Sequence, residues 1–148
     1  MSVKLNIIFN KVRKNNYFPT KIDIFNIINY LIINNNNTYN ICLYITNNKE
    51  ITKLNNIYKN INRSTNILTF NSKIYYFKKK ILFCDIIMSK DKIEEESKIY
   101  NIKLYLYWIH IITHGFLHIL GYTHKNNIDN YIMKNKELFI LKKFKLKK

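Results

Sequence analysis

All four histidines of the chain lie between positions 110 and 124, and three of them, His114, His118 and His124, follow the spacing H-x3-H-x5-H. Residues i and i+4 of a helix lie on one face, one turn apart, so the first two can direct their imidazoles at one ion. A third ligand on the next turn would lie too far along the axis. We expect Gly121 to end the helix in a left-handed conformation and bring His124 back. The spacing predicts a three-histidine metal site at the C-terminal end of a helix.

Three neutral imidazoles with an open fourth position are typical of a catalytic zinc site, so we expect one Zn²⁺ ion. A structural zinc is usually closed by four ligands, mostly cysteines, and Cys42 and Cys84 are far from the histidines in sequence. Zinc lowers the pKa of its bound water to about 7. The metal-bound water is therefore a predicted catalytic group.

The residues between the histidines narrow the chemistry. Metzincin proteases share this spacing, but there a glutamate follows the first histidine as general base, and here the residue is Gly115. Peptide hydrolysis is thereby disfavoured. Both glycines of the chain, Gly115 and Gly121, lie inside the cluster, which indicates that each position needs a positive φ or a close backbone approach. His110, one turn before His114, either packs on the buried side of the helix or faces the substrate.

The composition bounds the class of protein. A chain of 148 residues fits a single domain, residues 1–148. The net charge of +16 fits a phosphate-binding protein, although AT-rich codons would also enrich lysine together with asparagine and isoleucine. No apolar run approaches the roughly 18 residues of a membrane span, and the N-terminus lacks the features of a signal peptide. We expect a cytoplasmic protein without membrane contact, and we expect both cysteines to be buried core thiols.

Apolar periodicity and capping residues predict an α+β fold, in which about five helices pack on a mixed four-stranded sheet. The expected strands are Val3–Phe9, Tyr39–Thr46, Asn66–Phe70 and Lys80–Met88. The expected helices begin within Pro19–Lys21, after Asn47, after Ser89, at Leu104 and at Ile128. A basic, aromatic connection, residues 73–78, is expected between the last two strands, and the basic tail, about 142–148, is expected to fray.

The residues from His114 to His124 read H-G-F-L-H-I-L-G-Y-T-H and resemble H-G-x-L-H-L-x-G-Y-D-H, the signature of the YbeY endoribonucleases, which are metal-dependent enzymes of ribosomal RNA maturation. Two further segments, 54–70 and 84–89, resemble the family in the same order along the chain. The resemblance implies a single-strand-specific, zinc-dependent endoribonuclease acting in small-subunit rRNA processing and ribosome quality control. It also implies contact with the small ribosomal subunit and its assembly factors.

The chain departs from the family at several positions, and the family's arginine after Tyr58 is Lys59 here. In this family the arginine is thought to hold the RNA phosphate near the metal. Lysine keeps the charge but loses the bidentate fork, so Lys59 is the expected phosphate contact and Arg63 could compensate for the loss. Thr123 stands in place of the family's aspartate before the last histidine. Asn62 likewise replaces an aspartate and Cys84 a glycine.

Further residues are candidates for contact with RNA. Tyr58, together with Tyr75, Tyr76 and Phe77, could stack on unpaired bases or pack in the core. Asp85 is expected at the end of a strand, either near the site or capping the next turn, and His110 is a further candidate. A competing hypothesis is a ribosome-assembly RNA-binding protein whose metal is structural and which has little catalytic activity. Zinc-dependent cleavage of single-stranded RNA distinguishes the two.

Overall fold

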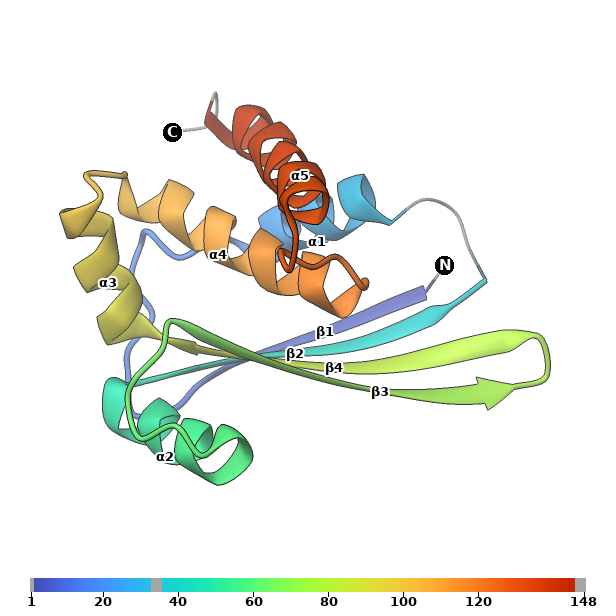
Figure 1. Ribbon diagram of the computed structural model, residues 1–148, viewed down its shortest axis with the longest axis horizontal. Coiled ribbons are helices and arrows are strands. Elements are labelled where there is room, and N and C mark those ends of the chain that lie inside the picture. The colour runs from blue at the N-terminus through green and yellow to red at the C-terminus, as the bar shows by residue number, and fades with distance from the viewer. Residues whose placement is uncertain (1, 33–35, 146–148) are drawn as a thin grey trace. The chain divides into compact units, whose positions relative to one another are not determined.

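The computed structural model describes residues 2–32 and 36–145 and contains a mixed four-stranded sheet and five helices, as the sequence predicts (Figure 1). The strands are β1 (Ser2–Phe9), β2 (Thr38–Thr46), β3 (Ile67–Tyr76) and β4 (Lys79–Ser89). The helices are α1 (Lys21–Leu31), α2 (Asn48–Lys59), α3 (Lys90–Ile99), α4 (Leu104–Ile119) and α5 (Asn127–Lys145). The chain forms two compact units: the first comprises residues 1–14 and 34–96, and the second comprises residues 15–33 and 97–148.

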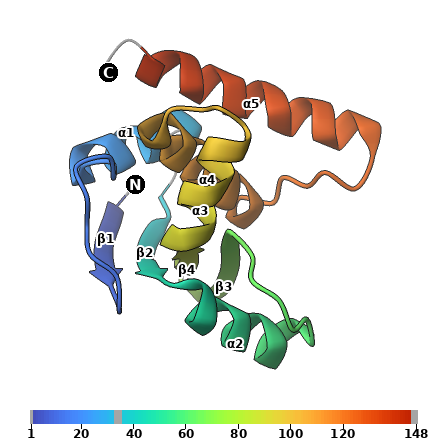
Figure 2. The same cartoon turned by 90° about the vertical axis from the view of Figure 1, so that its left-hand side faces the viewer.

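The first unit is built on the sheet, whose strand order is β1-β2-β4-β3. Strands β1, β2 and β4 are parallel, and β3 is antiparallel to β4. Figure 2 shows the four strands side by side in this order. Parallel neighbours need a crossover connection, whereas antiparallel neighbours can be joined by a tight turn. The expected mixed sheet is confirmed. The first connection of the chain runs through α1, and the second through α2 and β3.

Alternation along the strands gives the sheet two different faces. One face carries most of the buried apolar residues of the sheet, which are Leu5, Tyr39, Ile41, Leu43, Ile45, Leu82, Cys84, Ile86 and Met88. The opposite face mixes polar and apolar side chains, including the buried Leu68 opposite Ile87, and part of it is covered by α2, which contacts β4. Its residues Cys42 and Asp85 are neighbours in the parallel pairing of β2 with β4.

Caps fix both ends of α2. The side chain of Asn47 accepts a hydrogen bond from the backbone N–H of Glu50, as the sequence predicts. Asn60 ends the helix in the left-handed conformation, at φ 55°. Ser89 likewise accepts from the backbone N–H of Lys92 at the start of α3, so its predicted capping role is confirmed.

The predicted connection over residues 73–78 is wrong. Strand β3 continues to Tyr76 and β4 begins at Lys79, so only Phe77 and Lys78 form the turn. Isoleucine and tyrosine are strong strand formers, and pairing with β4 supplies the backbone hydrogen bonds of residues 73–76. The lysines of this segment favoured the prediction of an exposed connection.

The second unit contains α1, α4 and α5. Helix α4 is buried along most of its length, and its Trp108 meets the ring of Phe18 edge-on, with ring centroids 5.0 Å apart. Thr20 and Asp23 form a capping box at the start of α1. The hydroxyl of Tyr105 donates to the carboxylate of Asp23 at 3.0 Å, which ties α4 to α1.

The basic tail differs from expectation. Residues 142–145 continue α5, and Phe144 is fully buried. Its burial follows the helical spacing of Met133, Glu137 and Ile140, whose side chains are buried as well. Residues 146–148 lie outside the described part of the chain. The expected single domain of residues 1–148 stays a prediction. Within 2–32 and 36–145, no helix combines the length and the apolar character of a membrane-crossing segment.

Candidate metal centre

The end of α4 is shaped by a glycine, as the sequence predicts. Gly121 has φ +101°, and its N–H donates to the carbonyl of His118 while the N–H of Tyr122 donates to that of Leu117. These are the two hydrogen bonds of a Schellman motif. The chain reverses there, and His124 returns beside the last turn of α4. Of the two expected reasons for a glycine, the positive φ is confirmed at Gly121. Gly115 lies buried inside α4 with helical backbone, so a close backbone approach stays the prediction there.

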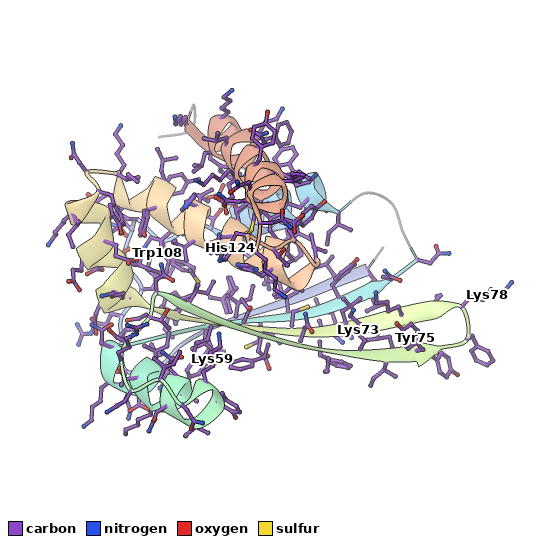
Figure 3. The ribbon with its side chains drawn as sticks, in the orientation of Figure 1. Lys59, Lys73, Tyr75, Lys78, Trp108 and His124 are labelled. Carbon is purple, nitrogen blue, oxygen red and sulfur yellow. The ribbon has the colours of Figure 1, made fainter. Side chains whose placement is uncertain are left out.

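His114, His118 and His124 converge on one point. Each offers one ring nitrogen, and these atoms lie within 4.8 Å of one another. The Nε2 atoms of His114 and His118 are 3.0 Å apart. Two nitrogens bound to a tetrahedral zinc at 2.0–2.1 Å lie about 3.3 Å apart, so this pair is close to that separation. The residues therefore fit a metal ion, and Figure 3 places His124 beside the end of α4.

The remaining ring nitrogens decide which tautomer each histidine adopts. Nδ1 of His114 lies 2.6 Å from Oε1 of Glu137, and Nδ1 of His118 lies 3.2 Å from the carbonyl of Tyr122. Because a carboxylate and a carbonyl can only accept, both Nδ1 atoms carry the proton and donate. Both Nε2 atoms are then lone-pair acceptors that face each other. Two acceptors at 3.0 Å repel, and a cation between them removes that repulsion.

The pKa of His118 supports the same protonation state. Burial lowers the pKa, and the neighbouring imidazoles of His114 and His124 lower it further. The hydrogen bond to Tyr122 and the charge of Glu137 oppose this shift. A neutral imidazole is the form that binds a metal, so burial favours the ligating form.

Glu137 is the functional residue that the sequence analysis missed. It comes from α5, is 7% exposed, and holds His114 through the 2.6 Å contact. Metal-bound histidines commonly donate their second ring N–H to a carboxylate, which fixes the ring and raises its basicity. A signal was available, because Glu137 occupies the apolar side of α5 at helical spacing from Met133 and Ile140. A carboxylate on a buried helix face predicts a hydrogen-bond or ion-pair partner, because burying an unpaired charge is unfavourable.

His110 lies one turn before His114 and shares the same carboxylate. Its Nε2 is 3.9 Å from Oε2 of Glu137, and its ring stacks on Tyr107 with centroids 6.0 Å apart. Burial lowers the pKa of His110, the charge of Glu137 raises it, and that of His114 lowers it. His110 also lines a pocket with His114, His124 and Glu137. Its contact with RNA stays a prediction.

The loop that carries His124 is held by a small hydrogen-bond network. The hydroxyl of Thr123 donates to Asp129 at 3.1 Å, and the side-chain amide of Asn126 donates to the same oxygen. Asn126 in turn accepts from the backbone N–H of Asp129 and caps α5. Thr123, where the resembling family has aspartate, thus reaches a carboxylate supplied from α5.

The predicted phosphate contact lies in the first unit. Lys59 is the last residue of α2 and is exposed (Figure 3). Arg63 is exposed in the following loop, and its carbonyl accepts a hydrogen bond from the side chain of Asn55 at 3.0 Å. Tyr58 is 63% exposed, with its ring 5.0 Å from that of Phe70. Buried Asn55 was not singled out from the sequence, yet it holds this loop.

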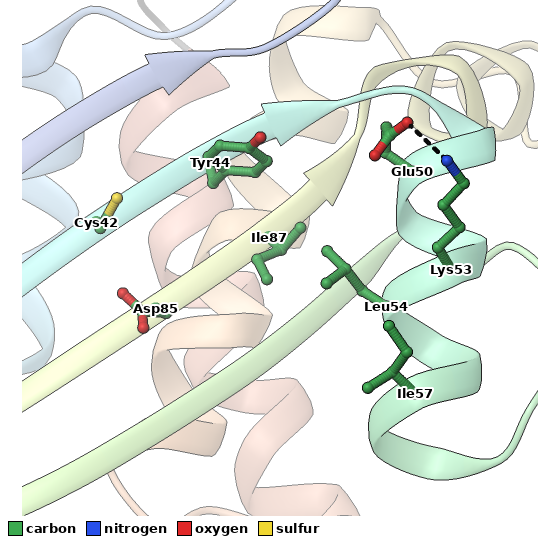
Figure 4. A pocket seen from close by; sticks show the side chains of 8 residues that line it. All are labelled: Cys42, Tyr44, Glu50, Lys53, Leu54, Ile57, Asp85 and Ile87. Atoms are coloured by element: carbon green, nitrogen blue, oxygen red, sulfur yellow. Dashed lines mark hydrogen bonds and ion pairs between the residues drawn. The ribbon is translucent and has the colours of Figure 1, made fainter.

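Asp85 was expected at the end of a strand, and this is wrong. It lies in the middle of β4, exposed, because β4 extends four residues further to Ser89. It borders a pocket of about 440 Å³ between the sheet and α2 (Figure 4). The other lining residues are Cys42, Tyr44, Glu50, Lys53, Leu54, Ile57 and Ile87. Whether Asp85 contacts RNA is untested, and its role stays a prediction.

The two cysteines are free thiols with different exposure. Cys84 is buried as expected, and burial followed by the charge of Asp85 raises its pKa to about 11. Cys42 is only partly buried, which corrects the expectation of a core thiol, and the same two causes raise its pKa. A protonated thiol is a poor metal ligand. This agrees with a centre made of histidines.

Known proteins resemble this chain in sequence and fold. The model of the family described as endoribonuclease YbeY matches residues 10–145. The chain is 40% identical over 93 residues to the endoribonuclease YbeY of Buchnera aphidicola subsp. Schizaphis graminum, covering 63% of this chain and 59% of that protein. It is 36% identical over 136 residues to the protein of the same name from Buchnera aphidicola subsp. Acyrthosiphon pisum, covering 92% of this chain and 88% of that protein.

A solved structure has the same fold. The solution structure of a protein from Thermotoga maritima superposes with a TM-score of 0.61 at 20% sequence identity, covering 93% of this chain and 87% of that one. The expected enzyme class, an endoribonuclease with an RNA substrate, is the one that the relatives' name states. Since the family model spans almost the whole chain, this protein belongs to the endoribonuclease YbeY family.

Proposed function

We propose that this chain is a zinc-dependent endoribonuclease that cuts single-stranded ribosomal RNA during maturation of the small-subunit rRNA. The proposal places it in the cytoplasm, in contact with the small ribosomal subunit and its assembly factors, with a part in ribosome quality control. One observation carries the metal dependence: His114 and His118 each donate Nδ1–H to a fixed acceptor and turn Nε2 toward one point. Membership of the family supports the RNA substrate.

The chain's own residues hold and orient the reacting groups. His114, His118 and His124 would hold the ion, with Glu137 and the carbonyl of Tyr122 fixing two of the rings. When bound, zinc supplies Lewis acidity toward a phosphoryl oxygen and a water of lowered pKa. Lys59 supplies a positive charge for the phosphate, and its exposure leaves the ammonium accessible to a polyanion.

The backbone of the loop after α2 restricts the positions of the Lys59 and Arg63 side chains. Asn60 ends the helix in the left-handed conformation, with its N–H bonded to the carbonyl of Asn56. Asn55, 3% exposed, then fastens the backbone of Arg63. Lys59 and Arg63 therefore belong to a loop with a defined backbone path. A defined path supports their assignment as phosphate contacts better than a free surface position would.

The decisive experiment is cleavage of a labelled single-stranded RNA by the zinc-loaded protein, compared with a duplex of the same sequence. We expect cleavage of the single strand, loss of cleavage with a chelator, recovery on adding zinc, and no cleavage by His114→Ala. Equal cleavage by the unmodified protein and by His114→Ala would contradict a metal-dependent nuclease. If neither protein cleaves while both bind RNA, the RNA-binding alternative with a structural metal is favoured. Cosedimentation with purified small ribosomal subunits tests the proposed partner.

A further inference from the structure

The β3–β4 hairpin ends in a segment, residues 73–80, that the proposed chemistry does not use. We call it the hairpin tip. Pairing of β2 with β4 begins at Ile81, so Lys79 and Lys80 lie beyond the described part of β2. Figure 3 shows Lys73, Tyr75 and Lys78 along this end of the hairpin. Among the described residues the tip pairs only within the β3–β4 hairpin, and its side chains are exposed apart from the half-buried Lys80.

The tip carries four positive charges and no negative one. The lysines are Lys73, Lys78, Lys79 and Lys80, and no acidic residue occurs from Ile67 to Cys84. None of the four forms an ion pair with any residue in 2–32 or 36–145. Charges without intramolecular partners are available to a polyanion, whose condensed counterions are released on binding.

Aromatic side chains are interleaved with these lysines. Tyr75 is 72% exposed and Phe77 90% exposed, and Tyr76 meets Phe77 edge-on with centroids 4.6 Å apart. In an antiparallel pair, residues directly opposite share a face. Tyr75 is opposite Lys80 and Tyr76 is opposite Lys79, so both faces of the tip combine a ring with a positive charge. Rings beside lysines are the elements of single-strand nucleic acid binding, since every base has a π-face to stack.

The backbone conformation of the turn supports a functional role for Phe77. Phe77 has φ 56°, a left-handed conformation that suits asparagine and glycine in two-residue hairpin turns. Among the other described non-glycine residues with positive φ, two are asparagines, Asn60 and Asn101, and the third is Lys11. At the tip the chain instead places a phenylalanine that gains almost no burial. An exposed ring in a disfavoured backbone conformation does not serve folding, and such outliers are often retained for a function.

We propose that the hairpin tip is a binding element for single-stranded RNA, in which Tyr75, Tyr76 and Phe77 stack on bases while the lysines contact phosphates. The choice of RNA as the polyanion rests on the proposed function. The interaction is sequence-tolerant, because stacking and phosphate contacts read no base edges. The tip thus adds affinity for RNA without taking part in bond cleavage.

The test measures binding of a fluorescent single-stranded RNA by anisotropy, with a chelator present so that no cleavage occurs. Phe77→Asn is the most informative variant, because asparagine suits φ 56° and should leave the hairpin at least as stable. We expect the Kd to rise about tenfold, the usual effect of losing one stacking ring. The matched control is Tyr131→Gln, which removes a ring that is 68% exposed on α5 and should leave the Kd unchanged.

Lysine variants test the electrostatic part. Replacing Lys73 and Lys78 by glutamine should lower the slope of log Kd against log salt by about 1.4, the value for two phosphate contacts on a single strand. An unchanged Kd in Phe77→Asn together with an unchanged slope would overturn the proposal. It would also be overturned if these variants lost binding to anionic phospholipid vesicles but kept RNA binding. RNA binding that depends on the hairpin tip, without zinc-dependent cleavage, would contradict the proposed nuclease function and would still support the RNA-binding role of the tip.

Discussion

The metal centre and the hairpin tip carry different chemistry, and their side chains are restrained to different degrees. In the centre, the rings of His114 and His118 are each held by a second hydrogen bond, one to a buried carboxylate and one to a backbone carbonyl. At the tip, Phe77 is 90% exposed, and the lysines form no ion pair within the described chain. A metal needs ligands preset in direction, whereas a flexible polyanion needs charges and rings that can adapt. The contrast predicts which mutations will affect metal affinity and which will affect RNA affinity alone.

Removing a ligand should give the largest effect and confine it to the centre. We expect His118→Ala to weaken zinc binding by more than about 100-fold, because two imidazoles remain and losing even a supporting residue of a ligand costs 10- to 100-fold. Competition with a chromophoric chelator measures the affinity. The control His110→Ala removes a neighbouring imidazole outside the triad and should keep zinc affinity within a few-fold. Comparable losses of zinc affinity in both variants would show that the ligands have been assigned incorrectly.

Glu137 tests whether the restraint on His114 matters as much as the ligand itself. Glu137→Leu suits the apolar side of α5 but leaves Nδ1 of His114 without its acceptor. We expect zinc affinity to fall about 10- to 100-fold, as for other supporting carboxylates of metal-bound histidines. Glu137→Gln keeps an accepting oxygen and should lose much less. RNA binding in the presence of a chelator should stay unchanged in both, and a loss there would blur the distinction between the two regions.

Two helix ends, Gly121 at the metal centre and Asn60 at the end of α2, allow a further comparison at the level of the backbone. Gly121 has φ +101° and Asn60 has φ 55°, and an alanine Cβ at Gly121 would meet nothing within 4 Å. The cost of Gly121→Ala is therefore backbone strain, about 2 kcal/mol of unfolding free energy, against about 1 kcal/mol for Asn60→Ala. Chemical denaturation measures both. Zinc affinity should fall in Gly121→Ala, which displaces His124, and stay constant in Asn60→Ala; the opposite order would contradict the role given to Gly121.

The smallest expected effect concerns the phosphate contact. Lys59→Arg restores the planar fork that the resembling family has at this position. Cleavage should increase about threefold, the low end of the usual value of one hydrogen bond. Zinc affinity should not change, because Lys59 is not among the ligands. Single-turnover cleavage at saturating zinc is the measurement, with Lys49→Arg, a second surface lysine on α2, as control. A decrease in rate would show that lysine is preferred here.

Most of the architecture could be predicted from local sequence. Asparagine and serine caps and apolar spacing located the helices within a few residues. The spacing of the three histidines predicted that they would come together. The predictions failed where tertiary partners outweighed composition. Residues 73–76 are strand because β4 pairs with them, and residues 142–145 are helix because Phe144 is buried. Charged side chains at these positions suggested loops, but backbone pairing with β4 and the burial of Phe144 decided the structure.

The sequence by itself determined the donor set of the centre, since one helical turn separates His114 from His118 and Gly121 permits the reversal toward His124. These are local effects of a few consecutive residues, and local geometry follows from residue type and spacing. Only the tertiary structure decided that Glu137 holds His114, that Asn55 fastens the loop of Lys59, and that Tyr75 and Phe77 are exposed on a hairpin tip. Each of these depends on segments distant in sequence, and their approach is set by packing and strand pairing that no local spacing encodes.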